Sequence, residues 1–200
     1  MTTCLSTLLQ TAGLTVTGVQ DDPVITAITP DSRAVKPGTL FVALPGTKVD
    51  GRTFIPAAVQ NGASAVLAPA DTIWPAQVPA CPLILAQNPR HVLAVLATAL
   101  AGRQPECLVG ITGTNGKTST TDFLRQLWAL QGLKAAGVGT LGLTGVNDPR
   151  ITMPSLTTPD PVTLANGLAA LAQAGVEHVA LEASSHGLEQ GRLDGLHLSA

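Results

Sequence analysis

The chain has 200 residues, a formal net charge of −2, and 45% hydrophobic but only 12% charged residues. Its length allows one large or two small domains, and its apolar content is enough for a packed core. The nearly neutral charge excludes a broad basic surface, so we expect no nucleic-acid partner, and any phosphate binding must come from local groups.

The first part of the chain alternates strand-like and helix-like segments. Prolines between 78 and 89 interrupt this alternation, which predicts a domain boundary near residue 88 and two domains, 1–88 and 89–200. Strands are expected at 24–29, 40–44, 65–68 and 83–86, and helices at 53–61 and 91–101, each helix ending near a glycine.

From Glu106 the pattern becomes strand, loop, helix and strand. An apolar run ending at Ile111 predicts a strand, the spacing of apolar residues over 123–130 predicts a helix, and 134–138 predicts the next strand. After a glycine-rich loop, Asp160-Pro161 is typical of a helix start, followed by a buried strand at 176–181. The alternation predicts an α/β fold, with a small N-terminal domain and a second, parallel-sheet domain that has helices on both faces and is incomplete at Ala200.

A phosphate-binding loop is the strongest functional signal. Gly110 to Thr118 lies between the predicted strand and the predicted helix, where glycines and a helix N-terminus favour an anion. Lys117 is placed to reach the β- and γ-phosphates, and Thr118 to contact Mg²⁺. The upstream glycine does not match the common P-loop spacing, and the alternative is a glycine-rich turn without a ligand.

Two further polar clusters follow predicted loops or strands: Thr157-Thr158, and 182–186 after the strand at 176–181. Carboxyl ends of parallel strands meet at one edge, so the clusters are expected to converge with the phosphate loop in one crevice. Glu182 would complete Mg²⁺ coordination there, or would be a solvated carboxylate. The segment Ser184-Ser185-His186 suggests a hydrolase triad, but the chain has no G-x-S-x-G elbow, which argues against a nucleophilic serine.

Cysteine usage and the N-terminus indicate a reducing compartment. Cys4, Cys81 and Cys107 are widely spaced and form no CxxC pair, which argues against a disulfide framework or a zinc site. The first residues lack a positive n-region, and the longest apolar stretch, 92–101, is too short to cross a bilayer. We therefore expect a cytoplasmic protein without membrane insertion.

Five motifs stand out along the chain: Asp31-Ser32-Arg33 with 37–43, Asp50-Gly51-Arg52, the loop 113–118, Thr157-Thr158-Pro159, and 182–188 with Gln190 and Arg192. In combination they resemble the Mur ligase family of peptidoglycan synthesis, particularly its MurE type, over the whole chain. The family's phosphate loop has the same shifted glycine spacing. At 47–49 and at Leu156 the chain departs from some members.

The resemblance implies a role for each group of residues. Lys117 would be catalytic, and Thr118 and Glu182 would hold Mg²⁺. ATP would bind at Gly113, Thr114, Asn115, Gly116, Lys117, Thr118 and Ser119. The UDP substrate would contact Pro30, Ser32, Thr47, Lys48 and Val49 in the first domain, and Thr157, Thr158, Ser184, Gln190 and Arg192 in the second.

The implied activity is ATP-dependent addition of meso-diaminopimelate, or L-lysine, to UDP-MurNAc-L-Ala-D-Glu through an acyl phosphate. The amino-acid-binding domain of the family lies beyond Ala200, so we expect the 200 residues alone to be inactive, and the enzyme to be a monomer. The alternatives are a non-catalytic nucleotide-binding fragment, a MurF or folylpolyglutamate type of ligase, and a generic P-loop NTPase. The serine-histidine run with Gln190 and Arg192 favours the MurE type.

Overall fold

The computed structural model describes residues 2–14, 21–46 and 49–200. The chain forms two compact units, Met1–Leu100 and Ala101–Ala200. Helix α3 (Pro89–Ala101) is the last element of the first unit along the chain. The domain boundary that the sequence indicates near residue 88 lies at the start of this helix, and it stays a prediction.

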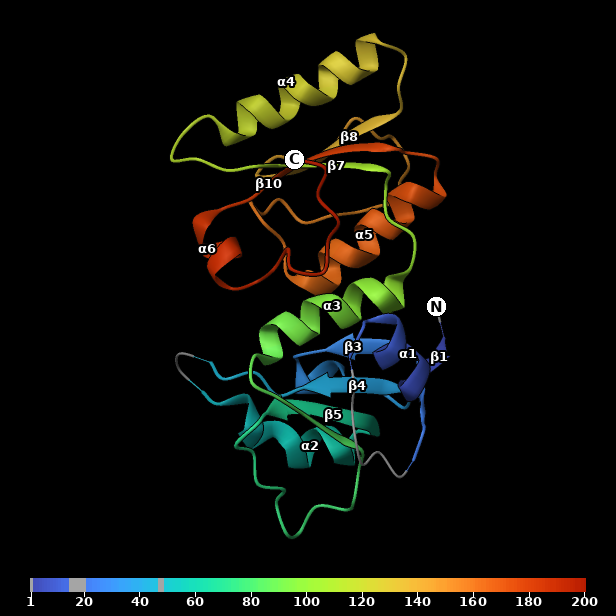
Figure 1. Cartoon of the computed structure of the whole chain (residues 1–200), viewed down its shortest axis with the longest axis vertical. Helices are drawn as coiled ribbons and strands as arrows, with labels where there is room; N and C mark the ends of the chain where they lie inside the picture. Colours follow the sequence, from blue (N-terminus) through green and yellow to red (C-terminus); the bar gives the residue numbers. More distant parts are fainter. Residues whose placement is uncertain (1, 15–20, 47–48) are drawn as a thin grey trace. The chain divides into compact units, whose positions relative to one another are not determined.

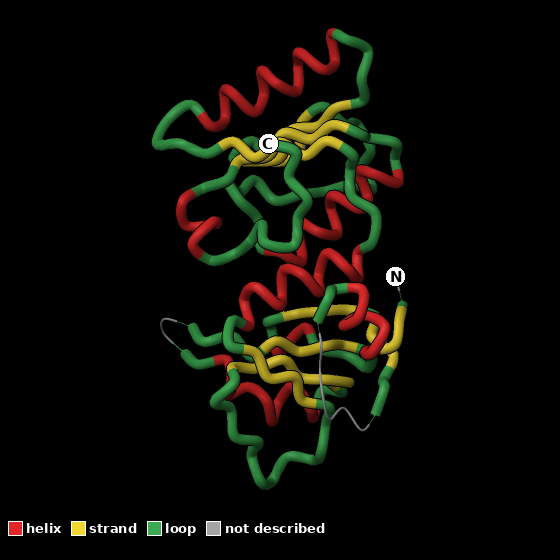
Figure 2. Tube along the Cα trace, in the orientation of Figure 1, coloured by secondary structure: helices red, strands yellow, loops and turns green. Residues whose placement is uncertain are grey.

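The first unit is built on a four-stranded, all-parallel sheet in the order β3-β4-β5-β6 (Figure 1). Helix α2 packs on one face through Ile55 and Ala58, which join Phe41 and Val66 in a buried cluster. Helix α3 lies on the opposite face (Figure 2). The elements are β1 (Thr3–Cys4), α1 (Leu5–Thr11), β2 (Val24–Ile25), β3 (Ala27–Thr29), η1 (Ser32–Ala34), β4 (Thr39–Val42), η2 (Gly51–Phe54), α2 (Ile55–Gln60), β5 (Ala63–Pro69), β6 (Leu83–Ala86) and α3.

The second unit is also a four-stranded sheet, in the order β7-β10-β8-β9. The first three strands are parallel, and β9 pairs antiparallel with β8 at the edge. Helix α4 covers one face and α5 the other (Figure 1), as predicted from the alternation of strands and helices. The elements are β7 (Cys107–Ile111), α4 (Lys117–Leu130), β8 (Ala135–Gly139), β9 (Gly142–Thr144), α5 (Pro161–Gln173), β10 (His178–Glu182) and α6 (Ser185–Glu189).

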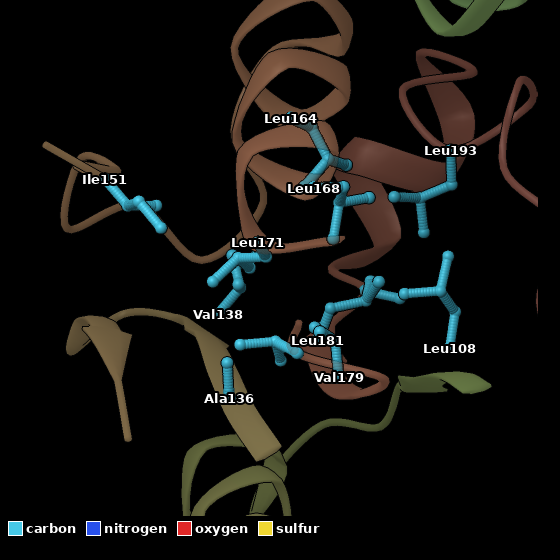
Figure 3. Packing of buried hydrophobic residues seen from close by; sticks show 12 residues of the cluster. Leu108, Ala136, Val138, Ile151, Leu164, Leu168, Leu171, Val179, Leu181 and Leu193 are labelled. Carbon is cyan, nitrogen blue, oxygen red and sulfur yellow. The ribbon is translucent and has the colours of Figure 1, made fainter. Parts of the chain in front are cut away.

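The core of the second unit lies between α5 and the sheet (Figure 3). Leu164, Leu168 and Leu171 recur at helical spacing and pack against the inner face of the strands, where Val138 and Leu181 lie. The predicted helix start is confirmed, because the Asp160 side chain accepts hydrogen bonds from the N–H groups of residues 162 and 163. This packing holds the carboxyl ends of β7, β10 and β8 at one edge of the sheet.

Several predicted elements differ from the observed ones. The expected strand 24–29 is two strands in different sheets, because β2 pairs with β1 whereas β3 pairs with β4. The expected helix 53–61 begins as the 3₁₀ turn η2, and its α-helical part is α2. Helices α1 and α6 and the edge strand β9 were not predicted, since each is too short to show a clear period.

Helix α4 is confirmed, but much of its apolar surface does not face the sheet. Phe123, Leu127 and Leu130 are exposed, whereas Thr121 is buried against the strands. Apolar periodicity therefore identified the helix without identifying its inner face. Across the part of the chain that the structure describes, we find no helix with the length and apolar character needed to cross a membrane.

Candidate nucleotide and metal site

The phosphate loop joins the carboxyl end of β7 to the N-terminus of α4. Gly116 is the N-cap of α4 and has φ +81°, a left-handed conformation that strongly favours glycine. The loop from 112 to 116 is exposed, so an incoming anion has access to it. The Lys117 ammonium folds back and donates to the Gly113 carbonyl at 2.7 Å, which holds the cation over the loop. This is the arrangement expected of a phosphate cradle.

Glu182 is brought to this loop by the sheet register. It is the last residue of β10, where it pairs with Ile111, the final residue of β7 before the loop begins. On its other side β10 pairs with β8, and Gly139 lies next to the carboxylate. A β-carbon at position 139 would overlap Glu182 Oε1, so the glycine is what makes room for the acid. Glu182 and Thr118 line the same small pocket.

The environment of the Glu182 carboxylate suits a divalent cation. Glu182 is only 2% exposed as a residue, so it is not the solvated acid of the alternative interpretation. Its two oxygens accept hydrogen bonds from the N–H and hydroxyl of Thr140, at 2.9 and 3.2 Å, and no ion pair reaches it among the described residues. A buried carboxylate without a cationic partner is costly, and Mg²⁺ prefers such an oxygen together with hydroxyl and phosphate oxygens.

The described residues contain no cluster of three or more histidine, cysteine or acidic side chains that could hold a metal ion by themselves. A magnesium ion here would therefore take part of its coordination from nucleotide phosphates and water, as Mg²⁺ commonly does. Thr118 and Glu182 fit this mode of binding because they supply one neutral and one charged oxygen at the end of the phosphate loop.

The second polar cluster is tied to Glu182 through Thr158. The buried Thr158 hydroxyl donates to the Glu182 main-chain carbonyl at 2.8 Å and accepts from the Ser184 N–H at 2.9 Å. Ser184 in turn caps α6 by accepting from the Gly187 N–H. Arg192 donates to the Thr158 carbonyl and to the Gln190 side chain. The structure thus brings together four predicted substrate contacts, Thr158, Ser184, Gln190 and Arg192. Much of their hydrogen-bonding capacity is used by partners inside the protein.

In the first unit, too, the predicted site residues follow the carboxyl ends of neighbouring parallel strands. Pro30 and Ser32 follow β3, and the exposed Val49 lies in the loop after β4. Because β3 and β4 are parallel neighbours, both segments lie at the same edge of their sheet. Thr47 and Lys48 lie outside the described residues.

One local motif stabilises three loops of the chain. In Asp31-Ser32-Arg33, Asp50-Gly51-Arg52 and Asp148-Pro149-Arg150, the arginine N–H and guanidinium both donate to the aspartate two residues earlier. These hydrogen bonds lower the pKa of Asp31 and of Asp148 to about 2, and they also lower the pKa of Asp50. Two of the motifs that carry the resemblance therefore have a structural role in shaping turns.

Comparison with known proteins agrees with this geometry. Residues 24–106 match the family described as "Mur ligase family, catalytic domain", and residues 111–200 match "Mur ligase middle domain". Together the two matches include nearly all of the described elements of both sheets. The chain belongs to the Mur ligase family.

Individual Mur ligases show how far the similarity extends. UDP-N-acetylmuramoyl-L-alanyl-D-glutamate–2,6-diaminopimelate ligase of Caulobacter vibrioides is 50% identical over 183 residues, covering 90% of this chain and 37% of the relative. The enzyme of the same name from Brucella melitensis biotype 1 is 53% identical over 178 residues, covering 88% and 35%. The chain thus spans a little over a third of the length of these curated relatives.

Solved structures support the same fold. A structure of a ligase with this name superposes with a TM-score of 0.78 at 29% identity, covering 99% of this chain and 39% of that one. MurF from Acinetobacter baumannii gives a TM-score of 0.58 at 17% identity over 92% of this chain and 36% of that one, a similarity of fold alone.

Sequence reasoning missed two residues that adjoin Glu182 in the candidate site, Gly139 and Thr140. Both follow the strand predicted at 134–138, so Thr140 is a polar side chain at the carboxyl end of a strand. The criterion that selected Glu182 would have selected Thr140 as well. Its hydrogen bond to Glu182, 42 residues away in the sequence, could not be predicted from neighbouring residues.

Proposed function

We propose that this chain forms the first part of an ATP-dependent ligase that adds diaminopimelate to UDP-MurNAc-L-Ala-D-Glu. The observation that carries the proposal is the 50–53% identity to curated ligases of that name across both units. The pocket shared by Thr118 and Glu182 beside the phosphate loop supports it.

In this proposal ATP lies along the loop 113–119, with its phosphates on the main-chain N–H groups and the N-terminus of α4. Lys117 would leave the Gly113 carbonyl and contact the β- and γ-phosphates. Thr118 and Glu182 would hold Mg²⁺, which supplies positive charge against the transferring phosphoryl group. Ser119, exposed in the first turn of α4, would lie near the phosphates.

The reaction joins two anions, because the D-glutamate carboxylate attacks the γ-phosphate of ATP. The carboxylate oxygen forms a bond to phosphorus, ADP leaves, and the resulting acyl phosphate is attacked by the amine of the diamino acid with loss of phosphate. Lys117 would stabilise charge on the transferring group. The substrate would be oriented by Thr157, Thr158, Ser184, Gln190 and Arg192. No covalent enzyme intermediate is required.

The first unit would bind the uridine nucleotide through Pro30, Ser32 and the loop 47–49. We propose a cytoplasmic enzyme that acts as a monomer. We expect titration of the ¹⁵N-labelled chain with UDP-MurNAc-L-Ala-D-Glu to shift amide signals near Ser32 and Val49, together with those of Thr47 and Lys48. Shifts confined to other surfaces, or saturable binding unaffected by Ser32→Ala, would contradict this assignment.

The activity itself is tested with a full-length ligase that contains these residues. We expect ADP and phosphate to form only when UDP-MurNAc-L-Ala-D-Glu and diaminopimelate are both present, and L-lysine to be a much poorer substrate. Nucleotide binding without turnover would indicate the non-catalytic alternative, and turnover with D-alanyl-D-alanine or folate substrates would indicate another branch of the family.

A further inference from the structure

Thr140 contacts both Glu182 and Thr157, two residues of the candidate site. Its N–H donates to Glu182 Oε1 at 2.9 Å, and its hydroxyl lies 3.2 Å from Glu182 Oε2 and 3.0 Å from the Thr157 hydroxyl. The proposed metal ligand and a proposed substrate contact are therefore joined through one side chain.

The directions of these hydrogen bonds follow from proton counting. A carboxylate only accepts, so the Thr140 hydroxyl must donate its single proton to Glu182. The Thr140 oxygen can then only accept from Thr157, whose proton is thereby used. Thr157 is left with lone pairs, and it can accept a hydrogen bond from a ligand but cannot donate one.

We propose that Thr140 is a positioning residue with two effects. It orients the Glu182 carboxylate, leaving the remaining lone pairs of its oxygens for a divalent cation at the pocket shared with Thr118. It also makes Thr157 an acceptor, so that the group recognised there is an N–H or O–H of the UDP substrate rather than a carboxylate or carbonyl oxygen. This inference rests on the proposed function.

Divalent-ion binding gives a test that does not depend on turnover. Thr140→Val removes the hydroxyl and keeps both the shape and the N–H contact, whereas Thr140→Ser restores the hydroxyl. In the full-length ligase with ADP, we expect Mn²⁺ affinity measured by electron paramagnetic resonance to fall about tenfold in the Val variant, the loss expected for a hydrogen bond to a charged group. The Ser variant should stay within about twofold to threefold of wild type.

Substrate binding gives the second test, through a double-mutant cycle with Thr157→Val. Thr140→Val alone should weaken binding of UDP-MurNAc-L-Ala-D-Glu several-fold, because the Thr157 hydroxyl loses the acceptor for its proton and its lone pairs are no longer held toward the ligand. In the Thr157→Val background the same change should leave substrate affinity nearly unchanged, while it still weakens Mn²⁺ binding. Thr26→Val is the matched control, because it removes a threonine hydroxyl that donates to the Gly38 carbonyl at 3.3 Å outside the candidate site, and it should alter neither affinity.

The outcomes separate this inference from the proposed function. Unchanged Mn²⁺ affinity in Thr140→Val, or strictly additive effects on substrate affinity in the cycle, would overturn the positioning role even in an active ligase. Wild-type protein that binds neither ADP nor the UDP substrate would overturn the proposed function instead. If the Val variant does not fold, Thr140→Ala removes the same hydroxyl with less bulk and is expected to give the same two results.

Discussion

Replacing Lys117 by alanine is expected to lower the ligation rate by about 10³-fold or more, because it removes the side-chain cation that we propose stabilises charge on the transferring phosphoryl group. In the structure this ammonium lies at the head of the phosphate loop, 2.7 Å from the Gly113 carbonyl. Phosphate release by the full-length ligase, measured with saturating UDP-MurNAc-L-Ala-D-Glu, checks the rate. The KM for the UDP substrate should change little, since Lys117 is proposed to contact the nucleotide.

Lys134→Ala is the matched control for this change. Lys134 precedes the amino end of β8, at the edge of the sheet opposite the phosphate loop, so its loss should leave the rate within about twofold of wild type. Formation of the acyl phosphate at a near-normal rate in Lys117→Ala would remove Lys117 from the chemical step.

Replacing Glu182 by glutamine is expected to raise the Mg²⁺ concentration needed for half-maximal rate by about tenfold or more. Glutamine keeps the shape of the side chain but removes the negative charge that a hard dication prefers. The two Thr140 contacts are at 2.9 and 3.2 Å, and the glutamine carbonyl oxygen can keep only one of them. A titration of activity against Mg²⁺ measures the effect, with the KM for the UDP substrate followed in parallel.

Glu177→Gln provides the comparison for this second change. Glu177 is exposed just before the amino end of the same strand, β10, so the variant carries the same chemical change far from the phosphate loop. It should need the same Mg²⁺ concentration as wild type. If Glu182→Gln also keeps the wild-type Mg²⁺ dependence, Glu182 is a structural acid, and the metal is held by other groups.

Much of the site could be predicted because its signals are local. The phosphate loop needs glycines at a strand-to-helix turn, and a stretch of nine residues contains the whole pattern. The helix start at Asp160-Pro161 and the apolar positions of α5 are local in the same sense. They were predicted correctly because capping and helical spacing depend on neighbours three or four residues away.

Other features depended on pairing between distant segments. Val24–Thr29 has the composition of one strand, yet it divides between two sheets because its two halves find different partners. The exposed apolar residues of α4 likewise show that a periodic helix does not by itself reveal which face packs on the sheet.

The sequence by itself determined the family, the α/β class, the phosphate loop and the identity of Glu182 as a candidate ligand, because each depends on residue types at short spacing. Only the tertiary structure decided that Glu182 is buried, that Gly139 makes room for it, and that Thr140 connects it to Thr157. Those relations depend on the register of β10 between β7 and β8, which brings residues about 40 positions apart into contact. Register is set by packing over the whole sheet, and no short stretch of the chain encodes it.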